Sequence, residues 1–182
     1  MASGRSGITG NWYNYHPQGK ANSCAPSCVR MMGELINGSD PGEGTTRAFV
    51  AVSEGGTSTL GDGGVVSHTG HDFETTPTEP DPMVAGLKAL RPAIEAEYIF
   101  ADPTSAELRT KIAEVSPQNP MIIGVFWAGG GGHVVVGVDK HADSNRIIVA
   151  DPAYGVKFIE PDGSYAPETG VTGRTVLAVY KT

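Results

Sequence analysis

The stretch Met121-Ile-Ile-Gly-Val-Phe-Trp127 and the following run Gly129-Gly-Gly-Gly-His133-Val-Val-Val-Gly-Val-Asp139 indicate the fold class. Both apolar runs are short and rich in β-branched residues, which favours strands over helices. Similar runs follow, so strands are expected at residues 121–127, 133–138, 146–149, 156–159 and 175–180. Turn sequences such as Asp143-Ser-Asn connect them, and consecutive strands are therefore predicted to be antiparallel neighbours in one sheet.

Before this sheet, apolar residues recur every three or four positions, a spacing that is typical of helices. The clearest helix is expected at residues 24–35, with Asn22 or Ser23 as the N-cap and Pro26 in the first turn. Further helices are expected after Asp81 as N-cap, over about 104–115 with a capping box from Thr104, and around 45–52, with a strand at 94–100. Helices first and a sheet second predict an α+β architecture, with the helical N-terminal part packed on a C-terminal antiparallel sheet.

The length and composition are those of one globular domain. The chain has 182 residues, of which 39% are hydrophobic and 18% are charged, and this is enough to bury a core. We expect a flexible N-terminal arm at 1–11 and a single domain at 12–182, which acts as a monomer. Residues 53–80 are rich in Gly, Ser, Thr and Pro and are expected to form a long loop.

The charge pattern narrows the class of partner. Thirteen basic and 20 acidic residues give a net charge of -7, and no cluster of Lys and Arg matches a row of phosphates, so nucleic acid is not expected to bind. A peptide or protein is the better candidate. The N-terminus lacks a basic stretch followed by an apolar run, and the apolar runs elsewhere are short, so we expect no signal peptide and no membrane association.

The chain has two cysteines in C-x-x-x-C spacing, which fits neither a disulfide framework nor the usual zinc or redox motif. Free thiols suit a reducing cytosol, either that of the producing cell or that of a target cell. His68-Thr-Gly-His71 lacks a third ligand with recognisable spacing. We therefore expect no metal and no cofactor.

Cys24 is the candidate nucleophile. A cysteine attacks a carbonyl as its thiolate, and a reference pKa of about 8.5 leaves the thiol mostly protonated at neutral pH. At the start of a helix, the positive end of the helix dipole lies beside the sulfur and favours the thiolate. Cys28 falls one turn later on the apolar face and is expected to be structural.

Three further residues complete a candidate catalytic set. His133 follows four glycines at the start of a strand, where its imidazole can point into a cleft and take the thiol proton. Asp151 ends the next strand and can orient that imidazole, with Asp139 and Asp143 as alternatives. Asp151 could instead only terminate a turn before proline. Gln18, six residues before the thiol, can donate its amide to an oxyanion, or it could be an ordinary surface glutamine.

In order and spacing, Gln18-x5-Cys24, the helix after it, the Gly-His133-Val-Val-Val strand and the Asp151-Pro-Ala turn resemble the papain-like cysteine peptidases. The closest resemblance is to the bacteriocin-processing, double-glycine peptidase family, and it extends from about Gln18 to Tyr180. It implies a papain-like fold, with Cys24 as nucleophile, His133 as base, Asp151 as orienting residue and Gln18 in the oxyanion hole. It further implies a cysteine protease that cleaves a peptide or protein through an acyl-enzyme.

The sequence also departs from that family. Ser23-Cys24-Ala25 stands where the family usually has Asp-Cys-Gly, and the segment 53–80 is an insertion, so cleavage of leader peptides does not follow. Related bacterial domains act as free-standing proteases or as toxin and effector domains, for which an inhibitor or immunity protein would be a further partner. Two other functions stay open: acyl transfer by a transpeptidase, transglutaminase or deamidase, since the phytochelatin synthases resemble this layout too, and a non-enzymatic binding module.

Overall fold

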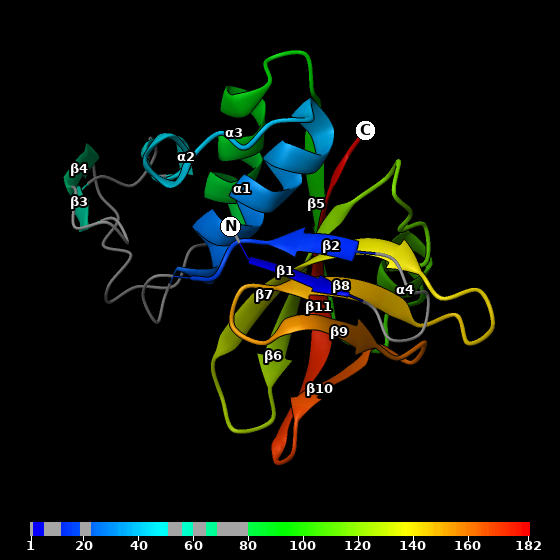
Figure 1. The fold of residues 1–182 in the computed structure, drawn as a ribbon. Helices are drawn as coiled ribbons and strands as arrows, with labels where there is room; N and C mark the ends of the chain where they lie inside the picture. Colours follow the sequence, from blue (N-terminus) through cyan, green and yellow to red (C-terminus); the bar gives the residue numbers. More distant parts are fainter. Residues whose placement is uncertain (1, 6–11, 19–22, 51–55, 60–64, 69–79) are drawn as a thin grey trace.

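The computed structural model describes residues 2–5, 12–18, 23–50, 56–59, 65–68 and 80–182. Its largest element is a sheet of seven strands, in which every pair of neighbours is antiparallel (Figure 1). In sheet order the strands are β10 (Ser164–Glu168), β9 (Gly155–Ile159), β8 (Ile147–Asp151), β7 (Gly132–Lys140), β6 (Met121–Trp127), β11 (Val171–Lys181) and β5 (Ala96–Phe100). The predicted antiparallel sheet is confirmed.

The sheet closes on itself through its last hairpin. Strand β10 pairs with β9 at Tyr165↔Ile159 and with β11 at Ser164↔Arg174. Strands β6 to β11 therefore form a closed ring, and β5 extends it along β11. Closure gives the sheet an inner and an outer face, so the alternating side chains of each strand enter two different cores.

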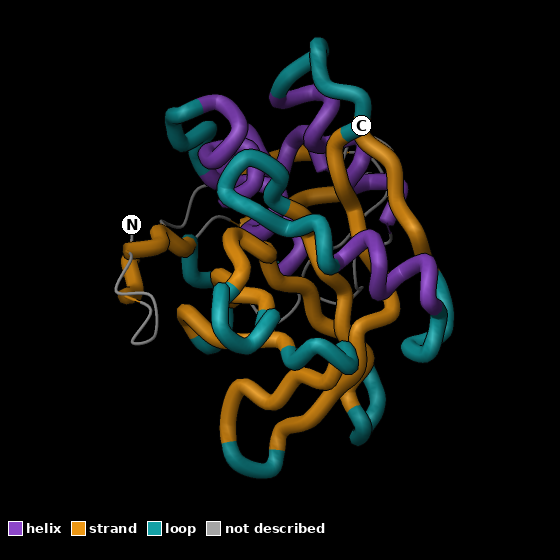
Figure 2. Tube along the Cα trace, turned by 90° about the vertical axis from the view of Figure 1, so that its right-hand side faces the viewer, coloured by secondary structure: helices purple, strands orange, loops and turns teal. Residues whose placement is uncertain are grey.

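Three helices cover the outer face together, and a fourth lies apart from them (Figures 1 and 2). The three are α1 (Cys24–Asn37), α2 (Glu43–Val50) and α3 (Pro80–Leu90), and the fourth is α4 (Ala106–Ile112). The α+β class is therefore confirmed. Helix α1 follows the apolar spacing predicted for 24–35, and Gly38 ends it with a left-handed φ of 73°.

Adjacent residues of β7 illustrate the two cores. Val134 and Val136 are buried against Val29 and other apolar residues of α1. Val135 is buried in the second cluster, together with Leu108 of α4. Because His133 is two residues before Val135, its side chain lies on the same face of the strand as Val135.

Several boundaries differ from the sequence-based expectations. Helix α3 begins at Pro80, so Asp81 lies in its first turn and is not the N-cap. The N-cap of α4 is Ser105, whose hydroxyl accepts a hydrogen bond from the N–H of Leu108, and not Thr104. Strand β10 was not predicted, because Ser-Tyr-Ala-Pro-Glu has neither a long apolar run nor a high content of β-branched residues.

Two small hairpins were also missed. The expected loop at 53–80 contains β3 (Gly56–Thr59) and β4 (Val65–His68), which pair with each other, so the prediction of an unbroken loop is wrong in its described part. Strand β1 (Ala2–Arg5) pairs with β2 (Trp12–Tyr15). The rest of the expected flexible arm at 1–11 and the residue His71 lie outside the described residues.

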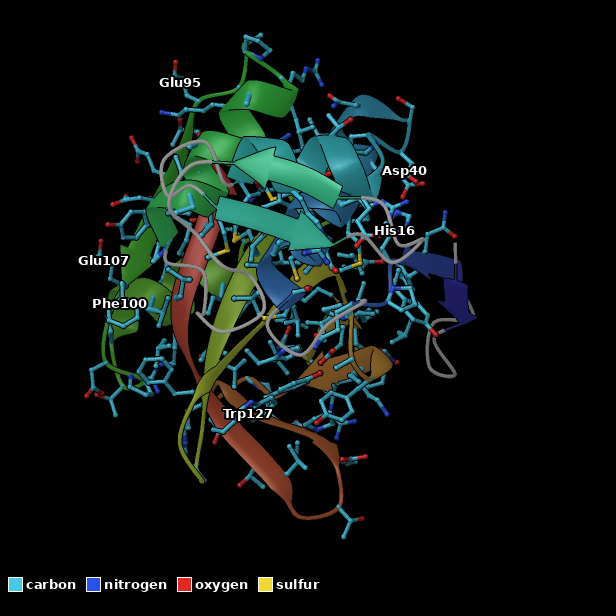
Figure 3. The ribbon with its side chains drawn as sticks, turned by 90° about the vertical axis from the view of Figure 1, so that its left-hand side faces the viewer. His16, Asp40, Glu95, Phe100, Glu107 and Trp127 are labelled. Atoms are coloured by element: carbon cyan, nitrogen blue, oxygen red, sulfur yellow. The ribbon has the colours of Figure 1, made fainter. Side chains whose placement is uncertain are left out.

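An ionic cluster fastens the segment after β2 to α1. The side chain of His16 is buried, and its Nε2 lies 2.7 Å from Oε2 of Glu34 and 3.8 Å from Oδ1 of Asp40. Figure 3 shows His16 and Asp40 on the same side of the molecule. Arg30 donates two hydrogen bonds to Asp40, at 2.8 and 2.7 Å, and these bonds hold the pKa of that carboxyl well below its usual range. Residues 16–18 are thus held against the helix that begins at Cys24.

Among the helices of the described residues, none combines the length and the apolar character that crossing a bilayer requires.

Candidate active site

Cys24 is the first residue of α1 and is partly exposed. The N-cap is Ser23, whose side chain makes no capping hydrogen bond to the helix and instead accepts one from Nη2 of Arg47, at 2.9 Å. The thiol therefore lies beside the N-terminal N–H groups of a helix of 14 residues. The positive end of a helix dipole is a position that favours negatively charged groups.

The glycine run determines where His133 lies. Gly130 and Gly131 have φ values of +93° and +85°, which side-chain-bearing residues rarely adopt. The N–H of Gly130 donates to the carbonyl of Trp127, and the N–H of Trp127 donates to the carbonyl of Gly131, both at 3.0 Å. This tight turn from β6 into β7 brings His133 to the second position of β7, next to the turn, with 8% of its surface exposed.

His133 contacts both Cys24 and Asp151. Its Nε2–H donates to Oδ1 of Asp151 at 2.9 Å, and Asp151 is completely buried. The side chain of Cys24 is a further polar neighbour of the imidazole and contributes to its raised pKa. Because Nε2 is engaged by the carboxylate, Nδ1 is the nitrogen that remains for a thiol. The imidazole thus has Asp151 on one nitrogen and Cys24 among its close neighbours.

The pKa of His133 follows from these neighbours. Burial alone would lower this pKa, but the hydrogen bonds with Asp151 and Cys24 outweigh the desolvation and raise it to about 9. An imidazole with this pKa is mostly protonated at neutral pH. The site therefore favours the imidazolium form of His133.

Asp151 is held by four donors. Its Oδ1 accepts the N–H of His133 and also the backbone N–H groups of Ala153, at 2.6 Å, and Tyr154, at 3.0 Å. Its Oδ2 accepts the hydroxyl of Tyr165, at 2.5 Å. A completely buried carboxylate without such partners would take up a proton or destabilise the fold. Here both oxygens of the carboxylate have hydrogen-bond donors.

Aromatic rings enclose the imidazole. The ring of Trp127 stacks on His133 with a centroid distance of 5.5 Å and an interplanar angle of 19°. The ring of Tyr154 meets His133 edge-on at 6.1 Å, and Trp127 also stacks on Tyr165 at 6.0 Å. Stacking of this kind restricts the rotation of the imidazole and limits the access of water to it.

Gln18 lies next to the turn that carries the carboxylate. Its backbone N–H donates to the carbonyl of Pro152, at 3.0 Å, and its side chain is partly buried. Because residues 16–18 are also fastened to α1, Gln18 is held between the two elements that supply Cys24 and Asp151.

Cys28 belongs to the core. It is completely buried, and its thiol donates to the carbonyl of Val134, at 3.2 Å. Burial first, and then the charges of Cys24 and Asp151, raise the pKa of Cys28 well above its ordinary value. This thiol is therefore unreactive, as its position on the apolar helix face suggests.

A cleft of about 370 Å³ opens at Cys24 and His133, between helices α1 and α3 and one face of the sheet. Of the described residues that line it, none is Lys, Arg, Asp or Glu, and most are apolar. Phe100 and Phe126 belong to this lining, with 57% and 53% of their surfaces exposed and their rings edge-to-face at 6.0 Å. Figure 3 labels Phe100 and a further aromatic lining residue, Trp127. The cleft can accept an apolar group beside the thiol.

Sequence reasoning missed Tyr165, Trp127 and Tyr154. Trp127 ends an apolar strand and Tyr154 follows Asp151-Pro-Ala, so nearness to a candidate residue was the available signal for both. Asp139, one of the alternative orienting residues, accepts the hydroxyl of Tyr13 at 2.9 Å and the N–H of Lys140. Asp139 is therefore engaged away from the imidazole.

The solved structures that are similar to this chain include the following two. A double-glycine motif protease from an AMS/PCAT transporter, in complex with the leader peptide, superposes with a TM-score of 0.55 at 15% sequence identity, over 100% of this chain and 99% of that chain. The Pseudomonas avirulence protein AvrPphB superposes with a TM-score of 0.37 at 13% identity, over 86% and 91% of the two chains. No protein-family model and no curated protein matches the sequence. The expected resemblance to the double-glycine peptidases is confirmed at the level of the fold.

Proposed function

We propose that this protein is a papain-like cysteine peptidase in which Cys24, His133 and Asp151 form the catalytic triad. One observation carries the proposal: a single imidazole is hydrogen-bonded to a buried carboxylate through Nε2 and lines the same cleft as a thiol at a helix N-terminus. Nucleophile, base and orienting residue have this relationship in thiol proteases. The similarity in fold to a double-glycine motif protease supports the same reaction class.

In the proposed reaction, the thiolate of Cys24 attacks the carbonyl carbon of a peptide bond, and a C–S bond forms. The tetrahedral oxyanion accepts hydrogen bonds from the backbone N–H of Cys24 and the side-chain amide of Gln18. The imidazolium of His133 then gives its proton to the leaving amine, and the C–N bond breaks. Water, deprotonated by His133, hydrolyses the thioester and restores the thiol.

The cleft suggests the class of substrate. It is apolar next to the thiol and has Phe100 and Phe126 exposed at its side, so a peptide with a large apolar residue near the scissile bond fits it. Gly131 and Gly132 also line it, and without side chains they allow the backbone of a substrate to approach closely. Delivery into a target cell as an effector stays a prediction from the sequence.

The test is a cleavage assay with wild-type protein, Cys24→Ala and, as a matched control, Cys28→Ala, each incubated with a library of proteome-derived peptides in H₂¹⁸O. Mass spectrometry then detects new termini. We expect new C-termini that carry ¹⁸O with wild-type protein and Cys28→Ala, and none with Cys24→Ala.

The isotope also separates the alternatives. Acyl transfer to an amine would give products that depend on Cys24 but lack ¹⁸O, and would contradict hydrolysis. Equal cleavage by wild-type protein and Cys24→Ala would contradict the assignment of the nucleophile. A binding module would leave the library unchanged.

A further inference from the structure

We infer that Tyr165 is a positioning residue of the proposed triad, because its hydroxyl holds the carboxylate of Asp151 in the orientation that the His133 imidazole requires. The inference rests on the proposed function, since it assigns a task to a residue that contacts Asp151 and no reacting atom. Tyr165 would act through Asp151 on the protonation and alignment of His133, and so on the formation of the Cys24 thiolate.

The two oxygens of Asp151 have separate donors. Oδ1 serves the imidazole and the backbone of the turn that follows Asp151, whereas Oδ2 receives the hydroxyl of Tyr165 at 2.5 Å. Tyr165 comes from β10, which is separated from β8 by β9 in the sheet. A donor from another strand prevents rotation of the carboxylate about its Cβ–Cγ bond, which the donors on Oδ1 alone would resist less strongly.

The surroundings of Tyr165 indicate that packing alone does not explain its hydroxyl. The residue is 1% exposed and packs in a cluster with Val149, Ile159 and other apolar side chains. A phenylalanine would fill the same volume without the need to satisfy a buried polar group. Burial first, and then the charge of Asp151, raise the pKa of Tyr165 well above its ordinary value, so the hydroxyl stays a neutral donor at all working pH values.

Loss of this hydroxyl has a predictable electrostatic effect. A buried anionic oxygen would be left without its donor, so the carboxylate would be held less firmly toward the imidazole. A misaligned carboxylate stabilises the imidazolium less well, and the thiolate that depends on this cation becomes less populated. The titratable groups that face Asp151 in this process are His133 from β7, Tyr165 from β10, Tyr154 from the turn after β8, and Cys24 and Cys28 from α1.

The experiment needs no peptide substrate. The rate at which iodoacetamide alkylates Cys24 is measured from pH 4 to pH 10 by mass spectrometry of the Cys24 peptide, which reports the thiolate fraction. The proteins are the wild type, Tyr165→Phe, His133→Ala and the matched control Tyr180→Phe, which loses a hydroxyl beside the same apolar cluster. The rate rises with pH on the acidic side of this profile. We expect the midpoint of that rise to shift to a pH about one unit higher in Tyr165→Phe and to be unchanged in Tyr180→Phe.

The experiment distinguishes a failure of the inference about Tyr165 from a failure of the proposed triad. If folded Tyr165→Phe follows the wild-type profile, the inference about Tyr165 is overturned, and the proposed triad stands as long as His133→Ala abolishes alkylation at low pH. If wild-type Cys24 itself behaves as an ordinary thiol with a pKa of about 8.5, unaffected by His133→Ala, the proposed function fails as well.

A second measurement observes Tyr165 in the wild-type protein, so it does not depend on the stability of Tyr165→Phe. In wild-type protein the hydroxyl proton of Tyr165 should give a slowly exchanging NMR resonance at low field, because it lies in a buried hydrogen bond to a carboxylate. It should move upfield in Asp151→Asn. An unchanged resonance in that variant would contradict the inference.

Discussion

Nε2 of His133 lies 2.9 Å from Oδ1 of Asp151, although the two residues are 18 positions apart and belong to different strands. The register of β7 and β8, with Val136 opposite Ala150, explains this contact. Extended by one residue, this register sets Asp151 opposite Val135, on the face of β7 that also carries His133. The contact is therefore built into the pairing of two central strands, which a mobile loop could not achieve as firmly.

Asp151→Asn is expected to lower kcat by about a hundredfold or more, because an amide cannot accept from all four donors and would favour the wrong imidazole tautomer. Steady-state kinetics on a cleaved peptide would measure this loss. The matched control is Asp139→Asn, which removes an alternative candidate carboxylate on β7 and should leave kcat within about twofold. The opposite ranking of the two variants would assign the orienting role to Asp139.

The alkaline limb of kcat/KM is expected near pH 9. His133 has a pKa raised to about 9 from its ordinary 6.5, so the imidazolium persists below that pH and is lost as the pH rises through it. Since a protonated His133 supports the thiolate and donates to the leaving group, the rate falls in the same window. If kcat/KM of the wild-type protein instead fell near pH 6.5, Asp151 and Cys24 would not raise the pKa of His133.

Trp127→Ala is expected to reduce kcat by about tenfold with a smaller change in KM, because the stacked indole restricts the rotation of His133. Trp127→Phe retains an aromatic face and should recover part of the rate. Loss of kcat and recovery by phenylalanine are measured with the same peptide, and melting curves show whether both variants stay folded. Equal kcat values in all three proteins would rule out this role of the indole.

Phe100→Ala is expected to raise KM for peptides with a large apolar residue near the cleavage site by about fivefold, with kcat and the melting temperature nearly unchanged. More than half of this ring is exposed, so its removal leaves no internal cavity. Tyr98→Ala offers a control, because it truncates another exposed aromatic residue of β5 that is outside the cleft lining. An equal increase in KM for both variants would indicate an indirect effect of β5.

The helices and strands were largely predictable because their signals are local. A spacing of three and four residues predicted α1, and short β-branched runs predicted β6, β7, β8, β9 and β11. The errors occurred where local signals are weak: in β10, whose sequence includes a proline and a glutamate, and in the short hairpins β1–β2 and β3–β4. Such strands form because a partner strand is already in place.

The candidate residues of the site were also recognisable from local context. Cys24 opens a helix, His133 follows a glycine turn and Asp151 ends a strand before proline, and each of these positions is readable within a few residues. Adjacent antiparallel strands then imply that the imidazole and the carboxylate can meet. The element types and a short list of candidate residues are therefore readable from the amino-acid sequence, since short-range backbone preferences encode both.

The way in which that carboxylate is held depends on contacts between distant segments of the chain. Tyr165 reaches Asp151 from a strand that the sequence pattern does not reveal, and it does so because β10 pairs with both β9 and β11 and closes the sheet. The choice between Asp151 and Asp139, the cover of Trp127 over the imidazole and the burial of Cys28 likewise depend on register and closure. These are properties of pairings between distant segments, whose free energy comes from packing across the whole sheet and leaves no signal in any short stretch of sequence.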